Sequence, residues 1–195
     1  MRELSLHVMD IVENGIAAGA ALIEIRMEED RKGNRLRMTI RDNGRGIPAD
    51  LLHKVLDPFY TTRTTRRVGL GLSLLRDAAK RCDGDFQIES KEGKGTEVST
   101  SFRLDHIDLA PLGDMASSVV SLIMGNTDVD FVYTHDVDGK VFRMDTREVK
   151  KELDGLPVVH PEVLKYLSSS IKESLAELGA GNFVSGVGRE SVQAP

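Results

Sequence analysis

Two polar residues near the start of the chain, Asp10 and Asn14, have the types and spacing of a metal or proton-transfer site. The apolar periodicity predicts an amphipathic helix over residues 3–18, so side chains four apart share one of its faces. A carboxylate beside an amide can hold Mg²⁺, directly or through its waters, and the carboxylate can also accept a proton from an attacking nucleophile. Taken alone, the same two residues are equally a solvated or helix-capping pair.

A second candidate site follows a predicted strand, where the sequence reads Asp42-Asn-Gly44-Arg-Gly46-Ile47. Two glycines separated by one residue let the backbone approach a flat ligand closely. A carboxylate at the end of a strand can accept a hydrogen bond from an exocyclic amine such as N6 of adenine. Taken alone, these residues are also typical of an ordinary Asp/Asn-Gly turn.

A third candidate site is a short glycine motif immediately before a second predicted helix. It consists of Gly69, Leu70, Gly71 and Leu72. Backbone N–H groups of such a loop, together with the helix N-terminus, can bind phosphate. Three arginines in the preceding predicted loop can add charge-assisted contacts to phosphate oxygens. They are Arg63, Arg66 and Arg67. A structural turn is the alternative for this motif in isolation.

In this order and spacing, the three clusters resemble the GHKL ATPase superfamily (gyrase, heat-shock chaperones, histidine kinases and MutL), which binds ATP in the Bergerat fold. The resemblance covers about residues 4–104 and implies ATP and Mg²⁺ as cofactors. It implies that Asn14 coordinates Mg²⁺, that Asp10 is the catalytic carboxylate, and that Asp42 reads adenine.

The same resemblance implies the remaining nucleotide contacts. They are Gly44, Gly46, Ile47, Arg63, Arg67, Gly69, Leu70, Gly71, Leu72 and Thr96. Thr96 belongs to a last glycine box, Gly93-Lys-Gly95-Thr96, which supports the adenine site in the family. Residues 57–63 resemble the short lid entrance of bacterial sensor histidine kinases.

The residue at position 10 leaves the reaction open. Kinases of the superfamily usually carry Asn there and hydrolysing members Glu, whereas this chain carries Asp, which is one methylene shorter than Glu. The residues after it resemble MutL, while the short lid resembles a kinase. We therefore expect a protein kinase that phosphorylates a separate protein partner. The alternatives are an ATP-hydrolysing conformational switch and a nucleotide-binding module without turnover.

The elements that must position these residues follow from periodicity and turn residues. Helices are expected over 3–18, 49–55 and 70–82, strands over 21–28, 35–41, 85–90 and 96–103, and a loop over 56–68. This order predicts a two-layer α/β sandwich, in which helices cover one face of a mixed sheet.

The second half differs from the first in charge. Residues 1–104 carry a net charge of +2 and residues 105–195 a net charge of −7, so we expect a domain boundary near residue 104. Residues 105–178 then form a small α+β domain, with strands over 129–135 and 140–145 and helices on either side. Residues 179–195 are expected to be a flexible Gly/Ser-rich tail.

Composition excludes several classes of protein. The single cysteine, Cys82, leaves no internal disulfide framework and no cysteine-based zinc cluster. The absence of Trp and of a basic stripe argues against nucleic-acid binding. There is no apolar run of 18 residues, and Glu3, Asp10 and Glu13 interrupt the N-terminal apolar stretch, so neither a membrane span nor a signal peptide is expected. We therefore expect a cytoplasmic protein.

Overall fold

Helices and strands alternate along the chain as the periodicity predicts, in a computed structural model that describes residues 2–52, 55 and 70–183. The first half contains α1 (Leu4–Ala17), β1 (Leu22–Asp30), β2 (Arg35–Asp42), α2 (Gly71–Arg81), β3 (Phe86–Lys91) and β4 (Gly95–Arg103). The second half contains α3 (Met115–Gly125), β5 (Asp130–Val137), β6 (Lys140–Asp145), α4 (Thr146–Glu152) and α5 (Pro161–Leu178).

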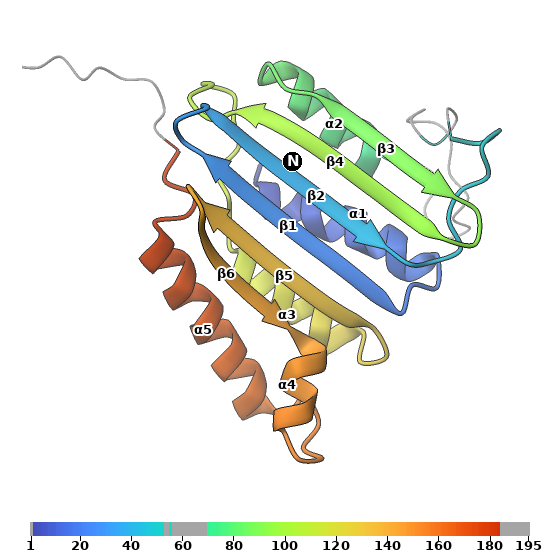
Figure 1. Ribbon diagram of the computed structural model, residues 1–195, viewed down its shortest axis with the longest axis vertical. Coiled ribbons are helices and arrows are strands. Elements are labelled where there is room, and N and C mark those ends of the chain that lie inside the picture. Colours follow the sequence, from blue (N-terminus) through green and yellow to red (C-terminus); the bar gives the residue numbers. More distant parts are fainter. Residues whose placement is uncertain (1, 53–54, 56–69, 184–195) are drawn as a thin grey trace, which may run out of the picture.

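The strands form one mixed sheet of six, in the order β3-β4-β2-β1-β5-β6. β1 and β5 run parallel, and the other neighbouring strands are antiparallel. Helices α1, α2 and α3 lie on one side of the sheet, behind it in the view of Figure 1, and α5 packs against α3 and β6. The predicted two-layer α/β sandwich is confirmed.

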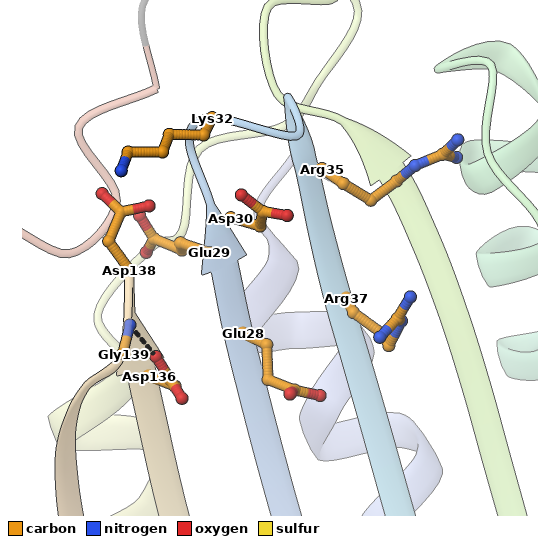
Figure 2. Close-up of a pocket in the computed structure, with 9 residues that line it drawn as sticks. All are labelled: Glu28, Glu29, Asp30, Lys32, Arg35, Arg37, Asp136, Asp138 and Gly139. Carbon is orange, nitrogen blue, oxygen red and sulfur yellow. Dashed lines mark hydrogen bonds between the residues drawn. The ribbon is translucent and has the colours of Figure 1, made fainter.

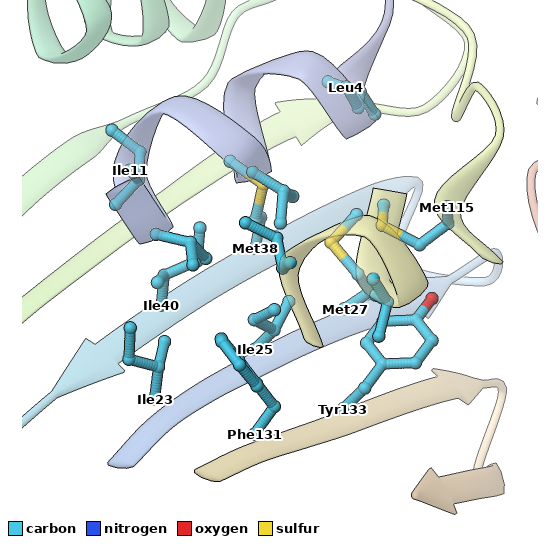
Figure 3. Close-up of a cluster of buried hydrophobic side chains, with 14 of the residues drawn as sticks. Leu4, Ile11, Ile23, Ile25, Met27, Met38, Ile40, Met115, Phe131 and Tyr133 are labelled. Atoms are coloured by element: carbon cyan, nitrogen blue, oxygen red, sulfur yellow. The ribbon is translucent and has the colours of Figure 1, made fainter. Parts of the chain in front are cut away.

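Strict alternation in β1 explains why only one face of the sheet is covered. Ile23, Ile25 and Met27 point into the core, and the intervening Glu24 and Arg26 lie on the opposite face. β2 repeats this pattern, and the buried side chains of both strands meet those of α1 and α3 (Figure 3). Each fully buried aliphatic side chain contributes about 1.5–3 kcal/mol to folding relative to an exposed one.

The separate small domain expected after residue 104 is not confirmed. β5 instead pairs with β1 in parallel register, from Leu22 opposite Asp130 to Glu29 opposite Val137, so the second half extends the first half's sheet. Phe131 and Tyr133, both fully buried, belong to the same hydrophobic core as β1 and α1. The change of charge near residue 104 marks a difference in surface composition.

Two further predictions concern segments near gaps in the description. Within the helix expected over 49–55, residues 49–52 form turns after Pro48. Val55 has a 3-10 conformation, and its amide donates to the Leu51 carbonyl at 3.1 Å, while residues 53 and 54 lie outside the described residues. Within the expected tail, residues 179–183 follow α5 in contact with the core, where Ala180 and Phe183 pack. Residues 184–195 lie outside the described residues.

Candidate nucleotide-binding site

The candidate adenine site lies where β2 ends and β4 begins. Asp42 is the last residue of β2 and pairs in register with Thr96, the second residue of β4. Both continue the row of core-facing residues on their strands, so they project toward the helices just beyond the hydrophobic core. The Gly44 amide donates to Asp42 Oδ1 at 2.8 Å, which fixes the carboxylate at the turn.

A serine that sequence reasoning missed links the last glycine box, residues 93–96, to the turn after β2. Ser90 Oγ lies 2.8 Å from Thr96 Oγ1, accepts a hydrogen bond from the Ile47 amide at 2.8 Å, and donates to the Gly95 carbonyl at 3.0 Å. Four of the sequence-predicted residues are thus held around one end of the sheet. They are Asp42, Gly44, Ile47 and Thr96. Ser90 was identifiable in principle, because it closes a predicted strand directly opposite Thr96 in the hairpin.

Two glycines allow the backbone to come close at this site. A Cβ on Gly15 of α1 would stand 2.9 Å from Asp42 Cβ, so a larger residue there would push α1 away from the carboxylate. Gly46 has a φ of +69°, and a Cβ there would overlap the Lys91 carbonyl. Gly46 therefore meets both a conformational and a steric requirement for glycine. The predicted role of this turn in close backbone approach fits both observations.

The two predicted metal-site residues lie on α1, beside the start of α2. Asp10 is half-buried and Asn14 is exposed one turn further along. A Cβ on Gly71 would stand 3.2 Å from Asp10 Cβ and 3.4 Å from Asp10 Oδ2. The carboxylate therefore lies against the first residue of α2, whose N-cap residue, Leu70, makes no side-chain capping bond. A helix N-terminus of this kind attracts anions.

The glycine motif before α2 is described only from Leu70 onward. Gly71 is the first residue of α2, Leu70 is exposed, and Leu72 is half-buried and packs against the core. The predicted contacts Arg63, Arg67 and Gly69 lie outside the described residues, as do Arg66 and the lid-like residues 57–63. Ser73 Oγ donates to the Leu70 carbonyl at 3.0 Å and so supports the first turn of α2.

Burial raises the pKa of the Asp42 carboxyl above its ordinary value, although backbone hydrogen bonds from Gly44 and Thr96 oppose that rise. The desolvated carboxylate is therefore a group that the folded protein keeps at a cost to stability. Carboxylates arranged in this way are typical of functional sites.

A pocket of about 370 Å³ opens at the opposite end of the sheet (Figure 2). Charged residues of the β1–β2 and β5–β6 turns line it, including Lys32 and Asp138. None of the sequence-predicted site residues that the structure describes belongs to it. Because Asp42 is opposite Ile23 near the other end of β1, this pocket is separate from the candidate adenine site.

Comparison with known proteins identifies the family. A family profile described as histidine kinase-, DNA gyrase B- and HSP90-like ATPase matches residues 2–106, slightly more than half of the chain. The chain belongs to this family. The resemblance expected from the sequence is confirmed, and the chain contains a GHKL histidine-kinase-like ATP-binding domain.

Sensor kinases are among the similar proteins. The chain is 30% identical over 109 residues to a putative sensor protein of Shewanella frigidimarina, covering 55% of this chain and 17% of that protein. It is 31% identical over 94 residues to sporulation kinase C of Bacillus subtilis, covering 48% and 22%. It is 43% identical over 58 residues to sensor kinase CckA of Brucella abortus, covering 29% and 6%. This chain thus spans less than a quarter of the length of each relative.

A solved structure shares the fold. The N-terminal domain of a DNA repair protein matches with a TM-score of 0.53 at 17% identity, over 74% of this chain and 53% of that one. The catalytic domain of histidine kinase ThkA matches with a TM-score of 0.41 at 27% identity, over 50% and 64%. None of the helices among the described residues combines the length and apolarity needed to cross a membrane.

One buried histidine beside the site makes stability depend on pH. His7 precedes Asp10 by nearly one turn of α1, is 2% exposed, and has no hydrogen-bond partner for Nδ1 within the described chain. Burial is the main cause that lowers its pKa to about 4. The unfolded chain therefore binds more protons than the folded chain between about pH 6.5 and pH 4, and stability falls as the pH falls through that window.

We expect the free energy of unfolding to drop by about 1 kcal/mol per pH unit from this residue alone as the pH falls from 6 to 5. Urea unfolding of the wild type and of His7→Gln at both pH values would measure it. The difference between the two proteins should shrink toward pH 5. Leu6→Gln, at a residue of the same helix that is 42% exposed and does not titrate, is the control and should keep the wild-type slope. An unchanged difference for His7→Gln would contradict the assignment.

Proposed function

We propose that this chain is a Mg²⁺-dependent protein kinase that transfers the γ-phosphate of ATP to a separate protein. The carrying observation is the position of Asp10 against Gly71 at the start of α2. It brings a carboxylate to the helix end suited to phosphate, while Gly15, further along α1, lies against Asp42 of the candidate adenine site. The relatives described above are named as a sensor protein and as kinases, which supports a kinase over other ATP-using proteins.

At the adenine end, Asp42 accepts a hydrogen bond from the N6 amine of the base. The Gly44 amide occupies one lone pair of Oδ1 and holds the carboxylate in place. Thr96 and Ser90 support the wall of the site through their shared hydrogen bond. Gly44 and Gly46 keep the turn narrow enough for the base to lie against the backbone.

At the phosphate end, the residues present fit a magnesium ion. An Asp10 carboxylate and phosphate groups at the same helix end would repel each other, and a bound cation would offset that repulsion. Carboxylate and amide oxygens from one face of α1 are ligands that Mg²⁺ accepts, together with phosphate oxygens and water. Asn14 is the proposed protein ligand, and the ion would neutralise charge on the transferring phosphate. The amides that begin at Gly71 bind phosphate oxygens.

In the proposed reaction, a hydroxyl or imidazole of the partner protein attacks the γ-phosphorus. A bond forms between the attacking atom and phosphorus, and the bond from phosphorus to the β–γ bridging oxygen breaks, releasing ADP. Asp10 accepts the proton that the attacking group loses. The partner protein supplies the nucleophile, so this chain's residues bind and orient ATP and deprotonate the attacking group.

A second candidate function is an ATP-hydrolysing conformational switch. The observation that favours it is again the carboxylate at position 10, which can orient and deprotonate water as readily as a protein nucleophile. In that case closure around ATP would change a protein-binding surface. The products distinguish the two functions, because hydrolysis yields free phosphate and kinase activity yields a labelled protein.

The test is incubation of the purified full chain with γ-labelled ATP and Mg²⁺, with and without extract of the source cells. Asp10→Asn is the test variant, and Asp77→Asn, an exposed carboxylate on α2, is the matched control. A labelled protein that requires the chain supports the kinase. Loss of that label by about 100-fold in Asp10→Asn but not in Asp77→Asn would assign the proton transfer to Asp10, the position at which this chain departs from the Asn usual in kinases of the superfamily. Free phosphate lost in the same variant supports the switch instead. Absence of both products contradicts catalysis and leaves a nucleotide-binding module.

A further inference from the structure

A buried row of three polar side chains lies at the end of the sheet opposite to Asp42. His135 Nε2 is 2.9 Å from Glu29 Oε1, and His135 Nδ1 is 2.7 Å from the Tyr133 hydroxyl. The side chains of Glu29 and His135 are 1% and 0% exposed, and Tyr133 is fully buried. Glu29 is six residues beyond Ile23, the partner of Asp42, which corresponds to about 20 Å along β1.

One placement of the protons satisfies both hydrogen bonds within this row. A neutral imidazole that donates from Nε2 to Glu29 leaves Nδ1 free to accept the hydroxyl proton of Tyr133. Every proton in the row then has an acceptor, and the charge remains on the Glu29 carboxylate. A buried carboxylate held in this way needs further donors, because an unpaired charge in the interior is costly.

One further donor comes from the segment after α5. The Gly181 amide donates to Glu29 Oε1 at 2.8 Å, and Arg31 Nη2 donates to the Gly179 carbonyl at 2.6 Å. The same Nη2 is 3.8 Å from Glu29 Oε2. Glu29 in β1 and Arg31 just after it therefore hold the segment in place. Glu29 binds the Gly181 amide, and Arg31 binds the Gly179 carbonyl. Figure 2 shows Glu29 turned toward Asp138, away from Glu28 on the open face.

The segment is seated by packing as well. Gly181 has a φ of +74°, and a Cβ there would stand 2.9 Å from Leu112 Cβ. Phe183 packs against the core and, with Leu104, lines a pocket of about 220 Å³ beside Glu29. α5 ends before the segment, at a left-handed Gly179, so the segment can leave the sheet without unwinding the helix.

We propose that residues 179–183 form a strap that opens and closes as one unit, and that the Glu29 carboxylate is its latch. The Tyr133–His135 pair positions the carboxylate, and Arg31 provides a second attachment through the Gly179 carbonyl. Closing the strap covers the buried polar row and ties the chain after α5 to the end of β1. Opening it admits water to Glu29 and uncovers the apolar wall beside Leu104. The proposal concerns the far end of the sheet and holds whatever reaction the nucleotide site performs.

Hydrogen–deuterium exchange of the full chain tests the strap. In Glu29→Gln, the amides of residues 181–183 should exchange about tenfold faster or more, as expected for the loss of one hydrogen bond to a charged acceptor. The Gly179 and Ala180 amides donate to carbonyls of α5 and should keep their wild-type exchange. The amides of α1 and β4 should keep their wild-type exchange. Glu28→Gln is the matched control, since Glu28 is the preceding carboxylate on the open face and should leave the strap unchanged.

Gly181→Ala provides an independent test, because it unseats the strap against Leu112 without altering Glu29. It should speed exchange of the same amides by a comparable factor. Arg31→Ala, at a partly exposed side chain, should give a smaller selective increase and serves if Glu29→Gln does not fold. Wild-type exchange of the strap in folded Glu29→Gln or Arg31→Ala would overturn the latch. Equal acceleration throughout the core would overturn it too, since opening would then be global.

Discussion

The Asp42→Asn variant is expected to lose ATP affinity by about 100-fold. Its amide is nearly isosteric with the carboxylate, but it removes the charge and can present N–H groups toward the N6 amine of adenine. A hydrogen bond to a charged acceptor contributes about 1.5–3 kcal/mol, and facing two donors in a desolvated site adds to that loss. The Gly44 amide, at 2.8 Å from Oδ1, competes for the one remaining acceptor oxygen.

The fold should tolerate this change. Burial raises the pKa of Asp42, so the ionised carboxylate is less favourable in the folded than in the unfolded protein at neutral pH. Asp42→Asn should therefore melt at the same temperature as the wild type or slightly higher, in the absence of nucleotide. Lost function with retained stability separates a binding role from a structural one.

Titration calorimetry with ATP and Mg²⁺ on the wild type and the variant measures the effect. Asp85→Asn, a carboxylate that is 92% exposed at the start of the second hairpin, is the matched control and should bind as the wild type does. An affinity within threefold of the wild type for Asp42→Asn would mean that another group reads the base.

Local sequence patterns predicted the elements of the fold well. The helix expected over 3–18 is α1 (Leu4–Ala17), and the one expected over 70–82 is α2 (Gly71–Arg81). The alternation in ALIEIRME and RLRMTIR is strict enough to identify both β1 and β2 and their core faces. These successes share one cause, since periodicity and turn residues act over a few residues and are visible in any one sequence.

Pairing between distant segments could not be predicted in the same way. Phe131 and Tyr133 identify a strand, but no local signal says that this strand joins β1 in parallel. The Glu29–His135 hydrogen bond links residues 106 positions apart, and neither residue is unusual within its own strand. At the site, the motif residues were identifiable because the glycines impose a recognisable spacing. Ser90, which acts through one hydroxyl, carries no such spacing.

A chain that ends at Leu104 is expected not to fold, although it retains nearly all of the family match. Loss of the second half would leave β1 at the edge of the sheet, without its pairing to β5 from Leu22 to Glu29. It would also remove the buried side chains that pack on β1. They are Met115, Val119, Ile123, Phe131 and Tyr133. At about 1.5–3 kcal/mol each, their burial is comparable to the typical total stability of a domain, about 5–15 kcal/mol.

Circular dichroism and urea unfolding of residues 1–104 measure this directly. We expect little cooperative transition and rapid cleavage by proteases, because Glu29 and the apolar face of β1 become exposed. A chain ending at Phe183 keeps every described element and is the matched control, which should unfold as the full chain does. Cooperative unfolding of residues 1–104 with undiminished ATP affinity would instead mean that α1, α2 and four strands suffice. The second half would then be an addition to a complete ATP-binding domain, and the parallel pairing of β1 with β5 would serve a purpose other than stability.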